Sequence, residues 1–456
     1  MRMGSGMCRS VVMLGFVLLL AGLASWSNGI VVPSGQADIR AYEGQQEQPQ
    51  QPEKSDLQTQ IGTVIVTPGN GPSLAVADFV ARSAGVDAGT SIFNQVLWDD
   101  LKFASVAGMV GKSLNPKSAV PDPASLKFDS WSGDPTRADY VAFGNLQDSG
   151  GLASDTYLYD VKTKHQLIAS RHTGDPRRMA HEFADEIVKL LTGKDGIATS
   201  KIAYVSGGVI KAMDYDGFGA RTLASDGPTL LFPQFSPDGR YFAYVSFKSG
   251  IPNIVVRSVD GGLVGGTHFN ATTTSPTISP SGQLAYSSAD SENGSMEIFV
   301  SNLDGSNRKQ LTHTKKAVNI APRWNPATGR EIAFISDRGG QPEVYVMDSS
   351  GANQRPLIAR GGHADSPSWS PDGHYIAFTW GGAGSFHVFV ADVATGHLLQ
   401  LTSRGSNQSP SWSPDGRHLV FQSTRSGREE IWRMHIDGTE QQQLTHGGGR
   451  LASWAK

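Results

Sequence analysis

Cysteine is almost missing from this sequence, which contains a single one, Cys8, among 456 residues. Without cysteine pairs there is no disulfide and no cysteine zinc site, so the folded domains must depend on their hydrophobic cores. The sequence also has no large excess of charge of either sign. Its 39 lysines and arginines nearly balance its 42 aspartates and glutamates, which gives a formal net charge of −3. This balance provides no electrostatic attraction to nucleic acid or to an anionic membrane.

The signature motifs of common hydrolases are also missing. The sequence has neither a Gly-x-Ser-x-Gly nucleophile elbow nor a His-Glu-x-x-His zinc motif. The Asp-Gly pairs in "DYDG", "LDGS" and "IDGT" lack the acidic ladder of an EF-hand loop, so we interpret them as turns instead of calcium sites. Three histidines at loop positions would form a metal cluster if they converged on one channel, but we favour solvated loop histidines: His313, His363 and His446. We therefore expect no catalytic residue, no cofactor and no metal.

Long hydrophobic runs are limited to one, "VVMLGFVLLLAGLA" over residues 11–24. Its 14 residues are too few to span a bilayer comfortably as a helix. Arg2 and Arg9 precede it, and small residues near Ala24 suit cleavage by signal peptidase. We predict a signal peptide over residues 1–24, which would remove Cys8, with a retained anchor helix as the alternative. Residues 25–60 are rich in glutamine and proline and are predicted to form a disordered linker.

Residues 61–196 are predicted to form a small mixed α/β domain. Strand-like runs such as "TVIVT" and "LAVADF" are followed by a stretch with apolar residues at helical spacing: Ile92, Val96, Leu97 and Leu101. A last helix is predicted from an N-cap at Asp175 to a C-cap glycine at Gly193. The predicted buried face of this helix holds Met179, Phe183, Ile187 and Leu190.

Residues 197–456 consist of repeats with strand patterns and no helices. Near copies of "WSPDGR" recur, and the anchors just before these turns stand 42 to 46 residues apart: Phe235, Ile278, Trp324, Trp369, Trp412 and Trp454. This period predicts four-stranded propeller blades. The stretch after residue 200 supplies three strands without an innermost one, and "LASWAK" supplies one innermost strand alone. We predict a six-bladed β-propeller closed by pairing of the C-terminal strand with the first blade.

The Ser-Pro-Asp-Gly stretches are interpreted as turns and not as catalytic residues. Proline and glycine favour the backbone angles of a tight turn, and aspartate bonds back to the backbone. The copy "ISPSGQ" has no aspartate, and "WNPATG" lacks both serine and aspartate. A catalytic serine-aspartate pair would not be lost from some copies in this way. These turns join the first two strands of each blade, so the loops before each innermost strand lie at the opposite end. The α/β domain enters at a second strand and is predicted to dock on the turn side.

The order of signal segment, small α/β domain and six-bladed propeller resembles the TolB family, periplasmic components of the Tol-Pal system of Gram-negative envelopes. The resemblance extends from about residue 61 to the chain end and is carried by "LAVADF", "SWSGDPTRADYVAFGNL", "EFADEIVKLLTG", "SKIAYVSG" and "MDYDG". It implies a non-enzymatic, monomeric scaffold in the periplasm. Such a scaffold links the peptidoglycan-associated lipoprotein Pal to inner-membrane TolA, with other outer-membrane proteins as further partners. It supports outer-membrane invagination at cell division and envelope integrity.

The resemblance also implies two partner sites. The TolA-binding segment would be "TVIVT", namely Thr63, Val64, Ile65, Val66 and Thr67, which suits strand addition; an ordinary edge strand of the α/β domain is the alternative. The Pal-binding face would lie in the loops before the innermost strands, near Thr272, Ser275, Ile320, His363, Asp365 and Asn407. The chain departs from the family in the long linker before "TVIVT" and in the loop "NATTTSP", which lacks an expected histidine.

A secreted hydrolase, or its regulatory subunit, with the propeller gating the substrate is the alternative function. The prolyl-peptidase-like enzymes carry similar repeats, but this sequence has no hydrolase domain after its propeller.

Overall fold

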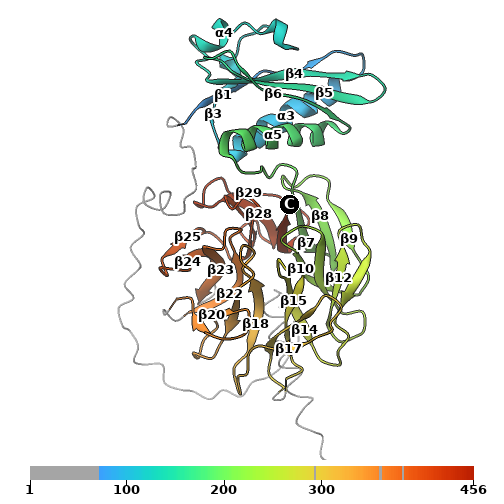
Figure 1. The fold of residues 1–456 in the computed structure, drawn as a ribbon, viewed down its shortest axis with the longest axis vertical. Helices are drawn as coiled ribbons and strands as arrows, with labels where there is room; N and C mark the ends of the chain where they lie inside the picture. Colours follow the sequence, from blue (N-terminus) through green and yellow to red (C-terminus); the bar gives the residue numbers. More distant parts are fainter. Residues whose placement is uncertain (1–70, 292–293, 359–361, 383–384) are drawn as a thin grey trace, which may run out of the picture. The chain divides into compact units, whose positions relative to one another are not determined.

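The computed structural model describes residues 71–291, 294–358, 362–382 and 385–456 (Figure 1). The predictions for a signal peptide, for the linker and for the segment of residues 63–67 therefore lie outside the described residues. Within the described ranges, no helix has both the length and the apolar character needed to cross a membrane.

The α/β domain is built on one sheet with the strand order β3-β1-β4-β5-β6, in which β2 also pairs with β4. β1 runs parallel to β3 and β4, whereas β4, β5 and β6 form an antiparallel meander. The strands are β1 (Ser73–Val76), β2 (Val80–Ala81), β3 (Gly108–Met109), β4 (Tyr140–Asp148), β5 (Leu152–Asp160) and β6 (Gln166–Thr173). The helices are α3 (Asp87–Ala104), α4 (Asp129–Ser132), α5 (Pro176–Thr192) and the 3₁₀ turns η1 (Lys112–Leu114) and η2 (Pro123–Ser125).

Both faces of this sheet are covered. Leu74 and Val76 of β1 lie in the core that includes α3 and α5, the two helices that run side by side beneath the sheet in Figure 1. Ala75, between them, belongs to a second core on the opposite face with Val141 of β4 and Trp131 of α4. Alternate residues of a strand point to opposite faces, which explains why the three buried residues of β1, Leu74 to Val76, are all apolar.

The ends of α5 are as predicted. The Asp175 carboxylate accepts hydrogen bonds from the backbone N–H groups of Arg177 and Arg178, and Gly193 closes the helix at φ 72°. The predicted buried face is correct for Met179, Phe183 and Ile187 but wrong for Leu190, which is 45% exposed. Leu191, one turn after Ile187, packs on the core in its place, since a helical face advances by 3.6 residues per turn.

The same correction applies to α3. Ile92 is 44% exposed, and the neighbouring Phe93 is buried in its place. Val96, Leu97 and Leu101, the other residues at the predicted helical spacing, are buried. Phe93 lies one turn before Leu97, so the apolar face of the helix begins one residue later than the spacing of Ile92 indicated.

The propeller consists of six four-stranded antiparallel sheets. Its first three blades contain β30 (Arg450–Ala455), β7 (Lys201–Ser206), β8 (Val209–Asp214) and β9 (Arg221–Ala224); β10 (Leu230–Phe235), β11 (Tyr241–Ser246), β12 (Asn253–Ser258) and β13 (Leu263–Gly266); and β14 (Thr273–Ile278), β15 (Gln283–Ser288), β16 (Glu297–Asn302) and β17 (Lys309–Gln310). The other three contain β18 (Asn319–Trp324), β19 (Glu331–Ser336), β20 (Glu343–Asp348) and β21 (Arg355–Pro356); β22 (His363–Trp369), β23 (Tyr375–Gly382), β24 (Ser385–Asp392) and β25 (Leu398–Gln400); and β26 (Asn407–Trp412), β27 (His418–Ser423), β28 (Glu430–His435) and β29 (Gln442–Gln443).

The C-terminal strand closes the ring, as the sequence predicted. β30 pairs antiparallel with β7, with Trp454 opposite Ile202 and Ser453 opposite Ala203. The Trp454 indole N–H also donates to the hydroxyl of Ser200 at 2.8 Å. The first and last parts of the propeller thus complete one blade, which removes a free sheet edge.

The Ser-Pro-Asp-Gly turns are structural, also as predicted. In the last copy, the Ser413 hydroxyl donates to Asp415 at 2.5 Å and Gly416 adopts φ 72°. The anchor Trp412 is buried, and its indole N–H donates to the carbonyl of Ser368 in the preceding blade at 2.9 Å. The recurring motif therefore shapes a strand corner and joins neighbouring blades.

The α/β domain contacts the turn side of the propeller, in agreement with the predicted docking face. Arg417, which ends the turn sequence "WSPDGR", donates to the carbonyl of Ala104 at the end of α3 at 3.3 Å. The ring of Phe103 stacks on His418 with 4.8 Å between centroids. The Nε2 of His435 lies 2.8 Å from the carbonyl oxygen of Phe103. The opposite end of the innermost strands is the end at which a partner was predicted to bind.

Candidate functional site: the entrances of the innermost strands

The six residues predicted to contact a lipoprotein lie at the start of four consecutive innermost strands. Thr272 directly precedes β14, and the other five lie within strands: Ser275 in β14, Ile320 in β18, His363 and Asp365 in β22, and Asn407 in β26. We call this set the strand-entrance residues. The sequence placed them in loops, whereas the structure extends each innermost strand by several residues toward the predicted binding face.

A β-bulge interrupts every innermost strand just after its entrance. Its pairing register shifts there, and one residue in each strand takes a positive φ of 50° to 54°: Phe232, Ser275, Ala321, Ser366, Ser409 and Leu451. In five of the six strands the next residue is proline: Pro233, Pro276, Pro322, Pro367 and Pro410. Proline has no N–H to give to a sheet and is tolerated at bulges, so these X-Pro pairs were the signal for this feature. The bulges were not predicted, because only the proline of the turn was interpreted.

The bulge is held by side chains from the second strand of the preceding blade. The backbone N–H of Ser409 donates to the Thr379 hydroxyl at 3.0 Å, and that of Ala321 donates to the Ser287 hydroxyl at 3.1 Å. The N–H of Leu451 donates to the Gln422 side chain at 3.0 Å. A non-glycine residue at positive φ is strained, so these bonds fix a backbone shape that would otherwise relax.

The strand-entrance residues differ in how much of them a partner can reach. Ile320 is 4% exposed and Asn407 is fully buried, whereas Thr272, His363 and Asp365 are partly exposed. Thr272, His363 and Asp365 are therefore the strand-entrance residues that another molecule could reach. The buried residues contribute by fixing the backbone below them.

Two blades fix this backbone with the same arginine-centred network. Arg425 donates through Nη2 to the Asn407 side-chain oxygen at 2.7 Å and through Nε to Ser423 at 2.9 Å. Its guanidinium lies over the Trp432 ring, 4.7 Å from the centroid. Arg338 makes the corresponding bonds to Asn319, at 2.8 Å, and to Ser336, at 2.9 Å, and lies over Tyr345. The sequence signal was an arginine at the same offset in "SDRGG" and "STRSG".

The threonine of the recurring "QLT" has a structural role on the same side of the blades. In three blades its hydroxyl accepts from a backbone N–H of the third strand at 2.8–2.9 Å: Thr312 from Ile298, Thr402 from Val388 and Thr445 from Ile431. Thr445 also donates at 2.6 Å to Glu430, a buried carboxylate that accepts from the N–H of Gly448. These bonds tie the outer strand to the loop that leads into the next innermost strand.

The charges of Asp365 and Arg323, on neighbouring innermost strands, interact with each other. Burial raises the pKa of the Asp365 carboxyl to about 6, an effect that the charge of Arg323 opposes. Burial also lowers the pKa of the Arg323 guanidinium to about 10. The two shifts have one cause, since an environment poor in water disfavours both charged forms.

Comparison with known proteins identifies the family to which this architecture belongs. Residues 188–456, more than half of the chain, match the family model described as the TolB beta propeller domain. The chain belongs to the TolB family. A curated relative named "Protein TolB homolog", from Chlorobium chlorochromatii (strain CaD3), is 31% identical over 327 residues, which cover 70% of this chain and 60% of the relative. Another of the same name, from Chlorobium luteolum, is 26% identical and is covered over 64% of its length. The chain thus spans less than two thirds of these TolB homologues.

A solved structure agrees on the fold. The crystal structure of TolB from Acinetobacter baumannii matches 85% of this chain and 97% of its own chain, with a TM-score of 0.70. The sequences are 24% identical, so the match supports the α/β domain and the propeller together, and not individual residue roles. The solved TolB thus has the same two-domain architecture.

Proposed function

We propose that this protein is a non-enzymatic periplasmic scaffold of a Tol-Pal-like system. It links a Pal-like outer-membrane lipoprotein to a TolA-like inner-membrane protein and so supports outer-membrane invagination at division and envelope integrity. Membership of the TolB family, with an α/β domain joined to a closed six-bladed propeller, is the observation that carries this proposal. The proposed chain division is a signal peptide over residues 1–24, a linker over 25–60, the α/β domain over 61–196 and the propeller over 197–456.

The lipoprotein is proposed to bind at the strand-entrance residues. The fixed bulges and the arginine networks support this choice, because a rigid surface loses little conformational entropy when a partner binds. The partly exposed Thr272, His363 and Asp365 are the proposed direct contacts. The α/β domain contacts the other end of the strands through Arg417 and His418, which leaves the entrances available.

The face is tested with a matched pair of variants of the mature protein. One variant combines Thr272→Ala, His363→Ala and Asp365→Asn, and the control is Arg240→Ala in an exposed turn at the other end of a blade. Immobilised protein is incubated with envelope extract, and a peptidoglycan-associated lipoprotein is identified by mass spectrometry. We expect recovery by the wild type and the control and reduced recovery by the triple variant. A folded wild type that recovers no such lipoprotein contradicts the proposed function, and equal recovery by both variants contradicts the proposed face.

The second partner is proposed to bind residues 63–67 by adding them as a strand to its own sheet. Deletion of residues 60–67 should abolish binding of a TolA-like protein and leave lipoprotein binding and thermal stability nearly unchanged. Affinity measurements with the purified partner, together with circular dichroism melting, check both parts. If the deletion unfolds the α/β domain, the segment is a core strand and the assignment is wrong.

A further inference from the structure

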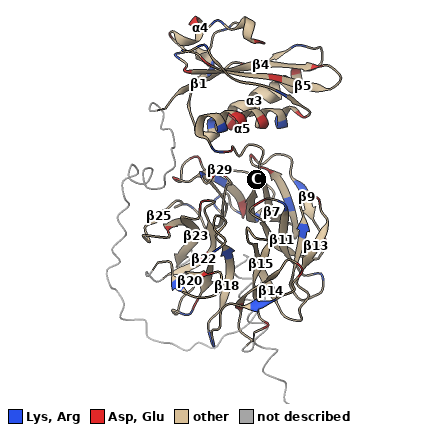
Figure 2. Ribbon diagram, viewed as in Figure 1, with Lys and Arg blue, Asp and Glu red and all other residues tan. Residues whose placement is uncertain are grey.

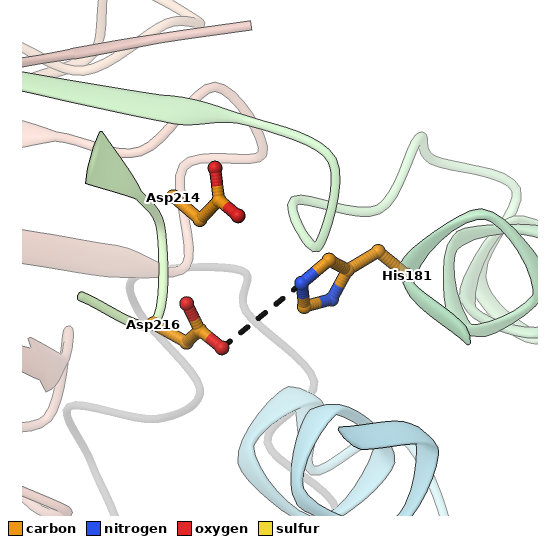
Figure 3. A group of neighbouring side chains, drawn as sticks. All are labelled: His181, Asp214 and Asp216. Carbon is orange, nitrogen blue, oxygen red and sulfur yellow. Dashed lines mark ion pairs between the residues drawn. The ribbon is translucent and has the colours of Figure 1, made fainter. Parts of the chain in front are cut away.

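A histidine and two aspartates meet where the α/β domain contacts the propeller (Figure 3). His181 comes from α5, Asp214 ends β8, and Asp216 lies in the turn that follows. One ligand atom from each residue lies within 4.8 Å of the others. The turn is the "DYDG" stretch, for which the sequence predicts a turn and no calcium site. The lipoprotein proposal does not use any of these residues.

The position of the His181 ring is set by a buried carboxylate. His181 is 4% exposed, and its Nδ1 lies 2.7 Å from Oδ2 of Asp100, which is itself 3% exposed. The other oxygen of Asp100 accepts a hydrogen bond from the hydroxyl of Tyr215 at 2.6 Å. Asp100 therefore holds the proton of the neutral imidazole on Nδ1. A carboxylate on the far nitrogen of a histidine is the usual partner of a metal-binding imidazole.

The other nitrogen of the ring is left without a donor or an acceptor. Among the residues that the structure describes, the buried Nε2 of His181 has no hydrogen-bond partner. It faces Oδ2 of Asp216 at 4.0 Å, as the dashed line in Figure 3 shows. With the proton on Nδ1, two electron-rich atoms face each other at this distance. A buried polar atom without a partner is costly, and a cation between the two atoms would remove that cost.

The two aspartates already contact cations but retain capacity for another. Oδ1 of Asp214 pairs with Lys201, a half-exposed lysine whose ion pair contributes little stability. Oδ2 of Asp216 pairs with Arg177, and its Oδ1 accepts from the N–H of Phe218 at 3.0 Å. A carboxylate offers about four lone-pair directions, so each can accept a further ligand bond.

We propose that His181, Asp214 and Asp216 bind a divalent transition-metal ion, of which Zn²⁺ fits the donor set best. One imidazole nitrogen and two carboxylate oxygens, with water in a fourth position, are ligands that Zn²⁺ accepts. Asp100 is a positioning residue that orients the imidazole. The ion joins α5 of the α/β domain to the turn after β8 of the propeller, and so clamps the contact between the two domains.

Binding requires the three side chains to move closer together. Ligand atoms of a tetrahedral zinc ion are about 3.3 Å apart, given Zn–N and Zn–O bonds of about 2.0–2.2 Å. The gap of 4.0 Å between Nε2 and Asp216 must therefore shrink, and Asp216 turns away from Arg177. Arg177 keeps a partner when this happens, because its guanidinium lies over the Phe218 ring, 4.0 Å from the centroid.

A proton on Nε2 is the competing occupant. Burial disfavours a charged His181, but the hydrogen bond and charge of Asp100, together with the charge of Asp216, leave the pKa of His181 raised. The charge of Arg177 opposes this rise. Metal and proton use the same lone pair, so metal titrations must be made well above neutral pH.

The test uses tag-free mature protein, freed of metal by chelation and titrated with Zn²⁺ at pH 8 by calorimetry. We expect one zinc ion per chain, with little heat from Mg²⁺ under the same conditions. His181→Gln and Asp216→Asn should each weaken the binding at least about tenfold, and Asp100→Asn should weaken it to a lesser degree. Bound Co²⁺ should give a visible spectrum typical of a site with few nitrogen ligands and several oxygen ligands. Zinc should raise the melting temperature of the wild type and not of the ligand variants.

The control is His374→Gln, which removes an exposed histidine that lies 3.4 Å from Asp372 and could bind zinc adventitiously. This variant should bind zinc as the wild type does. Circular dichroism verifies that each variant is folded. If His181→Gln does not fold, Asp214→Asn replaces it as the second ligand variant. Zinc binding that survives both ligand substitutions, or that is lost in His374→Gln, overturns the proposal. The proposal is also overturned if the wild type binds only a proton at this site. In that case the NMR titration curve of His181 is the same with and without zinc.

Discussion

The two ends of the innermost propeller strands are built from different kinds of sequence. At the turn end the chain repeats itself: Ser236, Ser370 and Ser413 each donate to the aspartate two residues later at 2.5–2.6 Å. At the entrance end the repeated features are a strained bulge and a proline, while the exposed residues differ from blade to blade. The repeated residues maintain the scaffold. Positions that vary between the repeats are not needed for the blade structure, so their side chains are available to bind a partner.

The turns at the turn end also differ among themselves, because one of them contacts the α/β domain. The turn of residues 413–416 is followed by Arg417 and His418, which contact α3. Figure 2 shows acidic and basic residues on α5, the other helix of this layer. A repeated turn thus acquires an individual role through the two residues that follow it.

The largest expected effect comes from removing an anchor at the turn end. Trp412→Ala should cost about 3–5 kcal/mol of folding free energy, because it leaves a cavity between blades. It also leaves the Ser368 carbonyl without the indole N–H that now lies 2.9 Å away. Urea denaturation monitored by circular dichroism measures the change. A loss below about 1 kcal/mol would mean that neighbouring blades do not depend on this contact.

Acid should weaken the contact between the α/β domain and the turn end. Burial, together with the charge of His418, lowers the pKa of His435 to about 4, whereas an unfolded histidine titrates near 6.5. The unfolded chain therefore binds a proton first as pH falls. The stability contributed by neutral His435 is complete above about pH 6.5 and is lost as pH falls toward 4, by roughly 3 kcal/mol in all.

This pH dependence is checked with denaturation curves at several pH values between 4 and 7. His435→Gln should flatten the part of the profile that arises from this group. His363→Gln is the comparison at the entrance end and should leave most of the acid loss in place. An unchanged profile in His435→Gln would assign the acid sensitivity to other groups.

Replacing the turn aspartate with serine should distinguish the turn next to α3 from a turn whose aspartate is exposed. The copy "ISPSGQ" already has serine at this position, where Ser279 and Ser281 lie 2.9 Å apart, so the turn itself tolerates the change. Asp415 is fully buried and pairs with Arg417 and His418. Asp415→Ser should therefore cost about 2 kcal/mol, since it leaves a buried guanidinium without its carboxylate.

Asp238→Ser is the matched control for that substitution. Asp238 is 41% exposed and pairs with an exposed Arg240, so its loss should change stability by less than about 0.5 kcal/mol. Melting temperatures of both variants give the comparison. Equal losses would show that the contact with α3 adds nothing to the turn of residues 413–416.

The sequence predicted the features that rest on periodicity and missed those that rest on packing. Blade number and ring closure follow from the anchor spacing and from the split first blade, and the helix ends follow from Asp175 and Gly193. The predicted burial of Leu190 was wrong, and Ile92 is exposed beside the buried Phe93, because spacing alone does not determine which of two adjacent apolar residues meets the core. The bulges had a visible signal in the repeated X-Pro pairs.

The cluster around His181 had no comparable signal. Asp100, His181 and Asp216 are far apart in the chain and lie on three different elements, and they meet only because α3 and α5 contact the propeller. The repeated arginine in "SDRGG" and "STRSG" marks the Arg425 network, but the sequence does not show that its partner is the buried Asn407. Contacts between distant segments need the assembled fold.

The smallest expected effect on stability comes from the partly exposed histidine at the entrance end. His363 packs against Phe386 with 5.4 Å between ring centroids, a contact worth about 1 kcal/mol at most. His374 lies at the other end of the same hairpin in an exposed turn, so His374→Ala is its matched control. Both variants should stay folded with melting temperatures near that of the wild type. Only His363→Ala should weaken capture of the lipoprotein, because recognition is expected where the repeats differ, and equal binding by the two variants would remove that distinction between the ends.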